Sequence, residues 1–127
     1  MGQYNAPLRD MHFVLHELLD VSNEFKALPA YADIDADTIN QILEEGAKFT
    51  SKVLFPLNAV GDREGCRLNA ETHEVTTPTG FKEAYRQFVE AGWPALPCDP
   101  EYGGQGLPVA GYNPLSEMLN SSNQAWY

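Results

Sequence analysis

The chain has 127 residues, of which 43% are apolar, and a formal net charge of −10. This length suits one folded domain with its own hydrophobic core, and the acidic balance excludes a nucleic-acid-binding surface, which would need clustered Lys and Arg. No apolar run approaches the roughly 20 residues of a membrane span, and the first residues lack the pattern of a secretion signal, so we expect a cytoplasmic protein without a membrane span.

A first helix is expected from about Pro7 to Asp20. Proline suits a first helical turn, and apolar residues recur at helical spacing: Leu8, Met11, Val14, Leu15, Leu18 and Leu19. His12 and His16 lie one turn apart, but no further ligand accompanies them, so we interpret them as partly exposed polar residues and expect no metal site. With the polar stretch that follows, broken by Pro29, residues 1–34 form an N-terminal helix and connecting segment.

Residues 35–127 are expected to form the main helical domain, which opens with a long second helix. Asp35 or Asp37 should cap this helix, and Pro56 should kink or interrupt it. We expect Glu44 and Lys48 to pair on its outer face. Its buried face is expected to comprise Ile39, Ile42, Leu43, Phe49, Val53 and Leu54.

Residues 65–79 have no helical period and indicate an irregular or short extended excursion, such as two short strands. Thr79 is then expected to cap a third helix, and Gly92 to end it. Trp93 is expected to anchor the core. The fold class predicted for the chain is therefore all-α, a helical bundle with this one excursion. In a cytosolic chain, Cys66 and Cys98 are expected to be free thiols.

The stretch Pro100-Glu101-Tyr102-Gly103-Gly104-Gln105-Gly106-Leu107-Pro108 is the most distinctive in the sequence. Glycine permits positive φ and close approach of other backbone, and proline fixes φ. With Tyr102 and Leu107 as apolar anchors, the stretch predicts a shaped loop rather than a flexible linker. Asn113-Pro114 is typical of a cap and a first-turn proline, so the last helix is expected to be split and to start afresh near Pro114.

Together with Gly92-Trp93 upstream, this stretch resembles the acyl-CoA dehydrogenase family. The N-terminal helical domain of that family carries Gly-Trp, a short apolar run, and then Pro-Glu-x-Tyr-Gly-Gly-x-Gly-Leu-Pro. Residues 57–65 resemble the end of a long helix in one branch of the family, and residues 116–123 resemble the helix beside the acyl chain. The additional first helix resembles the larger branch, whose members act on long-chain, aryl or methylthio-substituted acyl thioesters.

The resemblance implies the N-terminal domain of a flavin-dependent enzyme that dehydrogenates the α,β bond of an acyl-CoA thioester. In the family, a glutamate removes the α proton and FAD accepts the β hydride. The glutamate and most of the flavin site lie in other domains. We therefore expect no catalytic residue in this chain, assign no base role to Glu101 or Glu117, and expect FAD to bind only weakly to the chain alone.

What the resemblance assigns to this domain is one wall of the acyl-binding cavity. The residues expected near the substrate are Tyr102, Gly103, Gly104, Met118, Ser121 and Ser122, and for each of them simple packing within the fold is the competing interpretation. Expected partners of the full-length enzyme are the acyl-CoA substrate, an electron acceptor and further copies of itself, as a homo-oligomer.

An alternative function remains open, that of a non-enzymatic helical adaptor which docks a partner through the apolar 115–127 end. The sequence stops at Tyr127 in mid-pattern, with Ala125, Trp126 and Tyr127 expected to be uncovered. Because exposed aromatic residues rarely end a domain, this predicts a domain truncated at its C-terminus.

Overall fold

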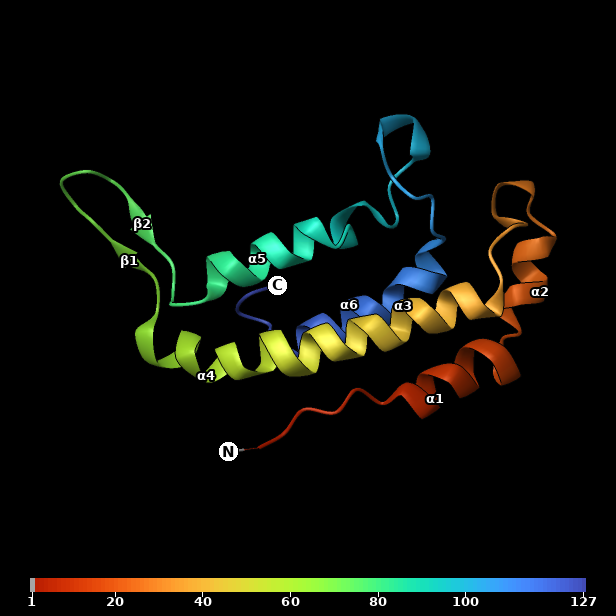
Figure 1. The fold of residues 1–127 in the computed structure, drawn as a ribbon, viewed down its shortest axis with the longest axis horizontal. Coiled ribbons are helices and arrows are strands. Elements are labelled where there is room, and N and C mark those ends of the chain that lie inside the picture. The colour runs from red at the N-terminus through yellow and green to blue at the C-terminus, as the bar shows by residue number, and fades with distance from the viewer. Residues whose placement is uncertain (1) are drawn as a thin grey trace.

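A computed structural model describes residues 2–127, which form a helical bundle with one small hairpin (Figure 1). The helices are α1 (Leu8–His12), α2 (Val21–Lys26), α3 (Ala36–Phe49), α4 (Phe55–Glu64), α5 (Phe81–Glu90) and α6 (Val109–Asn123). The hairpin consists of β1 (Arg67–Leu68) and β2 (Val75–Thr76). The predicted all-α class is therefore confirmed. Within the described residues, no helix combines the length and apolar character that crossing a membrane would require.

The long α3–α4 segment forms the spine of the bundle, and α6 runs beside it in the same direction (Figure 1). Gly46 of α3 lies against Leu115 of α6. Eight residues further along both the spine and α6, the Asn123 amide donates to the Leu54 carbonyl at 3.1 Å. The helix α5 runs in the opposite direction, since Phe81 at its start contacts Gly61 and Phe88 near its end contacts Phe49.

The predicted interruption at Pro56 takes the form of a π-helical turn rather than a break. The turn covers Thr50–Leu54 and joins α3 to α4. Proline lacks an N–H and clashes with the carbonyl four residues earlier, and a wider turn just before Pro56 accommodates both defects. The Thr50 hydroxyl, which is fully buried, donates to the Gly46 carbonyl at 2.8 Å. A second π-helical segment, Phe13–Leu18, extends α1, so that the first helical region ends close to its predicted boundary.

The core lies where the spine meets α6. The apolar residues with no measurable exposure are Ile39, Leu43, Leu54, Leu115, Met118 and Leu119. Beside this core, Trp126 packs edge-on against Phe88, with ring centroids 5.4 Å apart, and its indole N–H donates to the Phe81 carbonyl at 3.1 Å. The expectation that Trp126 is uncovered is therefore wrong. Trp93 is only 8% exposed, so its prediction as a core anchor is confirmed.

The helix ends follow the sequence signals in part. Asp35 caps α3, because its carboxylate accepts from the Thr38 backbone N–H at 2.8 Å. The predicted Thr79 cap of α5 is wrong. Gly80 holds the cap position at φ +87°, while the Thr79 N–H donates to the Glu64 carboxylate at 2.7 Å. Gly92, at φ +79°, ends the α5 region as expected.

Two further predictions require correction. The helix α6 is continuous from Val109, and Pro114 lies inside it instead of starting a new helix. Because Pro114 lies only about one turn from the helix start, the missing N–H removes little of the helical hydrogen bonding. On the spine, Lys48 pairs with Glu45 at 2.6 Å, so Glu44 is not its partner.

The extended excursion between α4 and α5 is confirmed. The strands pair antiparallel, with Arg67 opposite Thr76 and Leu68 opposite Val75. At the tip, the Asn69 side chain accepts from the Glu71 backbone N–H at 2.9 Å, and His73 adopts a positive φ of 59°. Figure 1 shows this hairpin projecting beyond the end of α4, away from the core.

Candidate functional site

The glycine-rich loop between α5 and α6 folds back onto the residues that precede it. The backbone N–H groups of Gln105, Gly106 and Leu107 donate to the carbonyls of Ala95, Cys98 and Leu96, at 2.9, 2.9 and 2.8 Å respectively. The Asp99 carboxylate also accepts from the Glu101 N–H at 2.8 Å. These bonds satisfy the backbone within the loop itself, which confirms the prediction of a shaped loop.

The glycines of this loop are required by its geometry. A Cβ on Gly104 would overlap the Cys98 carbonyl, which is backbone and cannot swing away. Gly103 and Gly106 have φ values of +84° and +65°, a region that favours glycine. The close backbone approach at Gly104 therefore holds the Gly103-Gly104-Gln105-Gly106 turn against residues 95–98.

The two residues predicted as loop anchors behave differently. Leu107 is 5% exposed and joins the core, as expected. Tyr102 is 82% exposed, so its prediction as an anchor is wrong, and its ring projects from a rigid loop into solvent. Its exposure leaves Tyr102 available to contact a second surface.

The substrate-binding residues predicted on α6 do not share one environment. Met118 and Ser122 are buried, with the Ser122 hydroxyl donating to the Leu119 carbonyl at 3.0 Å. Ser121 is exposed. None of the six predicted residues, the loop residues Tyr102, Gly103 and Gly104 included, lines any of the described cavities.

The largest of the described cavities, about 550 Å³, lies beside the loop. Its walls come from the segment before α3 and from the loop itself: Ala30, Tyr31, Asp33, Ile34, Pro97, Asp99, Pro100, Gln105, Gly106 and Leu107. The lining carries two carboxylates and no cationic side chain. The cavity therefore lies between the N-terminal connecting segment and the glycine-rich loop.

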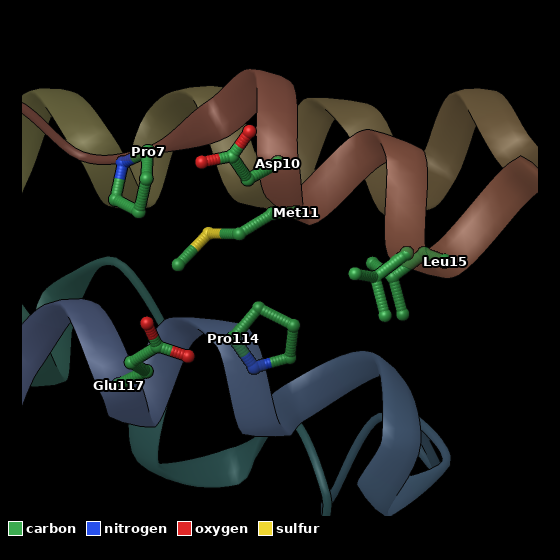
Figure 2. A pocket seen from close by; sticks show the side chains of 7 residues that line it. Pro7, Asp10, Met11, Leu15, Pro114 and Glu117 are labelled. Carbon is green, nitrogen blue, oxygen red and sulfur yellow. The ribbon is translucent and has the colours of Figure 1, made fainter. Parts of the chain in front are cut away.

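A second cavity, about 290 Å³, lies between the first helical region and α6, and we call it the α1–α6 groove. It is lined by Pro7, Asp10, Met11, Val14, Leu15, Pro114 and Glu117. Figure 2 shows Met11 and Pro114 facing each other across the groove, with Asp10 on the α1 side and Glu117 on the α6 side. The groove is thus an apolar slot with one carboxylate on each wall.

Two tyrosine hydroxyls lie on or near α6. Burial raises the pKa of the Tyr4 phenol and the nearby Glu117 carboxylate raises it further, whereas the neighbouring Ser121 side chain lowers it. Burial, followed by the hydrogen bond with Tyr127, raises the pKa of Tyr112. The Tyr127 hydroxyl lies 3.3 Å from that of Tyr112 and 3.2 Å from that of Ser116. Both phenols therefore stay protonated at neutral pH and do not act as bases.

His12 and His16 contact each other and a neighbouring helix. The rings of His12 and His16 stack at 5.8 Å, and His16 Nε2 lies 2.7 Å from the Asn40 side-chain oxygen. Among residues 2–127, no group of three or more His, Cys, Asp or Glu side chains is arranged to hold a metal ion. Cys66 and Cys98 are both free and exposed, as expected.

No protein-family model matches the chain. It is, however, 38% identical over 97% of its length to a 3-methylmercaptopropionyl-CoA dehydrogenase of Ruegeria pomeroyi. It is 32% identical over 98% of its length to the broad-specificity linear acyl-CoA dehydrogenase FadE5 of Mycobacterium tuberculosis. It is also 32% identical over 94% of its length to a butyryl-CoA dehydrogenase of Syntrophomonas wolfei. The chain belongs to the acyl-CoA dehydrogenase family, as an N-terminal helical domain. It spans about one fifth of the length of each of these relatives, 20% in each case.

Acyl-CoA dehydrogenases need FAD, and the largest described cavity does not fit it. A flavin diphosphate is held by cations or by helix N-termini that present free N–H groups. The largest described cavity instead carries Asp33 and Asp99, which would repel a diphosphate. The carboxylates of Glu101 and Glu117 are both exposed, which does not suit a base that works in a dry pocket.

Proposed function

We propose that this domain forms one wall of the acyl-binding cavity in an enzyme that dehydrogenates an acyl-CoA thioester. The observation that carries the proposal is the 38% identity over 97% of the chain to a curated dehydrogenase of this class. The relatives' names span a short straight acyl group, linear acyl groups of broad range and a methylthio-substituted one. We assign this chain to the same substrate class, acyl-CoA thioesters, without a chain length.

The reaction itself depends on groups outside this domain. FAD, when bound in the whole enzyme, supplies the acceptor for the β hydride. The role of this domain is to form a rigid wall that excludes water from the acyl chain and limits the length of acyl chain that can bind. The self-contained hydrogen bonding of the glycine-rich loop and the tightly packed α6 support that part, because both hold their surfaces fixed.

The wall proposal rests most on the predicted residues that remain accessible. Tyr102, Gly103 and Ser121 are exposed, whereas Met118 and Ser122 are buried in the domain and would act by supporting α6 from behind. The remaining expectations belong to the whole enzyme. We expect that enzyme to be a cytoplasmic homo-oligomer that passes its electrons to a separate acceptor.

The adaptor alternative finds less support, because the aliphatic side chains of the 115–127 end are buried while Ala125 and Tyr127 stay exposed. That function needed an exposed apolar face at residues 115–127, but Leu115, Met118 and Leu119 have no measurable exposure. These side chains hold α6 to the spine of the bundle and are not free to bind a partner.

A chimera tests the wall proposal. The matched fifth of the Ruegeria dehydrogenase is replaced with this chain, and kcat/KM is measured for straight-chain acyl-CoA substrates of increasing length. If α6 lines the acyl chain, Ser121→Trp should shift the preference toward shorter substrates, whereas Asn120→Trp, one position away on the exposed surface, serves as the control. Identical length profiles for both variants and the unmodified chimera would contradict the wall.

A further inference from the structure

The α1–α6 groove is open and apolar, and its rim is acidic. Met11 and Leu15, at 7% and 4% exposure, form its buried base, and Val14, 40% exposed, stands at its edge. Leu18, one turn further along the π-helical segment, is 65% exposed and prolongs the apolar strip beyond the groove. Such a strip of accessible apolar side chains along a helix is the surface that helix-in-groove recognition uses.

The charges at the groove specify what can lie there. Asp10 and Glu117 stand on opposite walls (Figure 2), both exposed, and no cationic side chain lines the groove. An occupant with an apolar side chain between two cations would place that side chain against Met11 and each cation near one carboxylate. An acidic or purely apolar helix would leave both carboxylates uncompensated as they lose water.

A second copy of this chain is a poor occupant. Each copy carries a net charge of −10, so pairing two acidic grooves would bring like charges together. The curated relatives, by contrast, contain about four times as much polypeptide outside the matched region, since this chain spans 20% of each. The charge pattern and the relatives' length both indicate that the occupant of the groove comes from that polypeptide.

We propose that the α1–α6 groove receives a helix from the remaining polypeptide of the dehydrogenase, one that presents an apolar side chain flanked by Lys or Arg. The inference rests on the proposed function, because it takes the occupant from the same enzyme. It adds a specific docking surface. Met11, Val14 and Leu15 make the apolar contact, and the carboxylates of Asp10 and Glu117 favour a partner with Lys or Arg side chains.

The test uses the chimera with a photo-reactive p-benzoylphenylalanine in place of Val14. After illumination, mass spectrometry of the digested protein identifies the cross-linked peptide, and the flavin content of the same sample is read from its absorbance. We expect a cross-link to a downstream helix that carries Lys or Arg beside an apolar residue. Asp10→Lys combined with Glu117→Lys should lower the cross-link yield by about tenfold. Glu71→Lys, at the tip of the hairpin, is the matched charge control.

The outcomes separate the two proposals. A flavin-containing chimera that gives no cross-link, or a cross-link only to a second copy or to a helix without cations, would overturn the groove assignment and leave the proposed function standing. An unchanged yield in the double variant, with helix content by circular dichroism preserved, would also overturn it. A chimera with neither flavin nor cross-link, although folded by circular dichroism, would overturn both.

Discussion

Gly46 of α3 faces Leu115 of α6 so closely that a Cβ at position 46 would lie 2.7 Å from the Leu115 Cδ1. Met118 closes the other side, with its Cε 3.3 Å from the same point. Both neighbours have no measurable exposure, so neither can move into solvent. The contact fixes how near α6 lies to the spine, and therefore where the surface of α6 stands.

Gly46→Val should destabilise the domain through this contact. The added methyl groups must displace Leu115 in a packed core, which costs about 1–3 kcal/mol. Urea unfolding followed by circular dichroism measures the loss. Gln41→Val, on the exposed side of the same helix, introduces the same residue and should change the free energy of unfolding by no more than about 0.5 kcal/mol. Equal effects of the two substitutions would refute the close approach.

Asn123→Ala should remove a buried polar link between α6 and the π-helical turn. The side-chain amide of Asn123 donates to the Leu54 carbonyl at 3.1 Å. The side-chain oxygen of Asn123 accepts from the backbone N–H of Trp126 at 3.2 Å. The Trp126 backbone N–H keeps its bond to the Asn123 backbone carbonyl, but the Leu54 carbonyl loses this donor inside the protein, which should lower the free energy of unfolding by about 1–3 kcal/mol. Asn120→Ala is the control, because the Asn120 amide is exposed and bonds only within α6. Thermal unfolding of both variants gives the comparison.

The two neighbouring glycines of the loop should respond differently to alanine. A Cβ on Gly104 meets the Cys98 carbonyl, whereas a Cβ on Gly103 meets open space and only the strain of a positive φ. Gly103→Ala should cost about 1 kcal/mol, and Gly104→Ala should disrupt the loop. Hydrogen exchange at the Gln105, Gly106 and Leu107 amides reads this directly. Continued protection of those amides in Gly104→Ala would be incompatible with the described loop.

The Asp35 cap should make stability depend on pH in one direction. Hydrogen bonds from Thr38, first from its hydroxyl and then from its backbone N–H, lower the pKa of the Asp35 carboxyl below its ordinary value. The folded state therefore favours the ionised form, so the contribution is complete above the unfolded pKa and is lost as pH falls through the folded pKa. The stability difference between the wild type and Asp35→Ala should shrink as the pH falls below about 5. A stability difference that stays constant as the pH falls would contradict the cap.

Local chemistry explains which parts of the fold were predictable. The sequence predicted the roles of Gly92 and Leu107 from their turns and from apolar periodicity. It narrowed the α3 cap to Asp35 or Asp37, of which the structure shows Asp35. Asn113-Pro114 carries an equally strong local signal, but the buried face of α6, which includes Gly111 before the proline and Leu115 after it, keeps the helix continuous. In that case tertiary packing prevailed over the propensity of a dipeptide.

The candidate site was less predictable for a related reason. The exposure of Tyr102 depends on how the loop sits on residues 95–98, which no local pattern encodes. The α1–α6 groove combines Asp10 and Met11 with Pro114 and Glu117, residues from opposite ends of the sequence. Its only sequence signal was the apolar stripe of the first helix, which is wider than one buried face requires.

The most direct measurement of the central claim is anaerobic titration of the chimera with acyl-CoA while the flavin absorbance is recorded. The same dehydrogenase without its matched fifth serves as the reference. If this chain is the acyl wall of such an enzyme, the chimera retains FAD and its absorbance bleaches on addition of acyl-CoA, while the reference does neither. A folded chimera whose flavin is not reduced by any acyl-CoA, or a reference that is reduced equally well, would contradict the account.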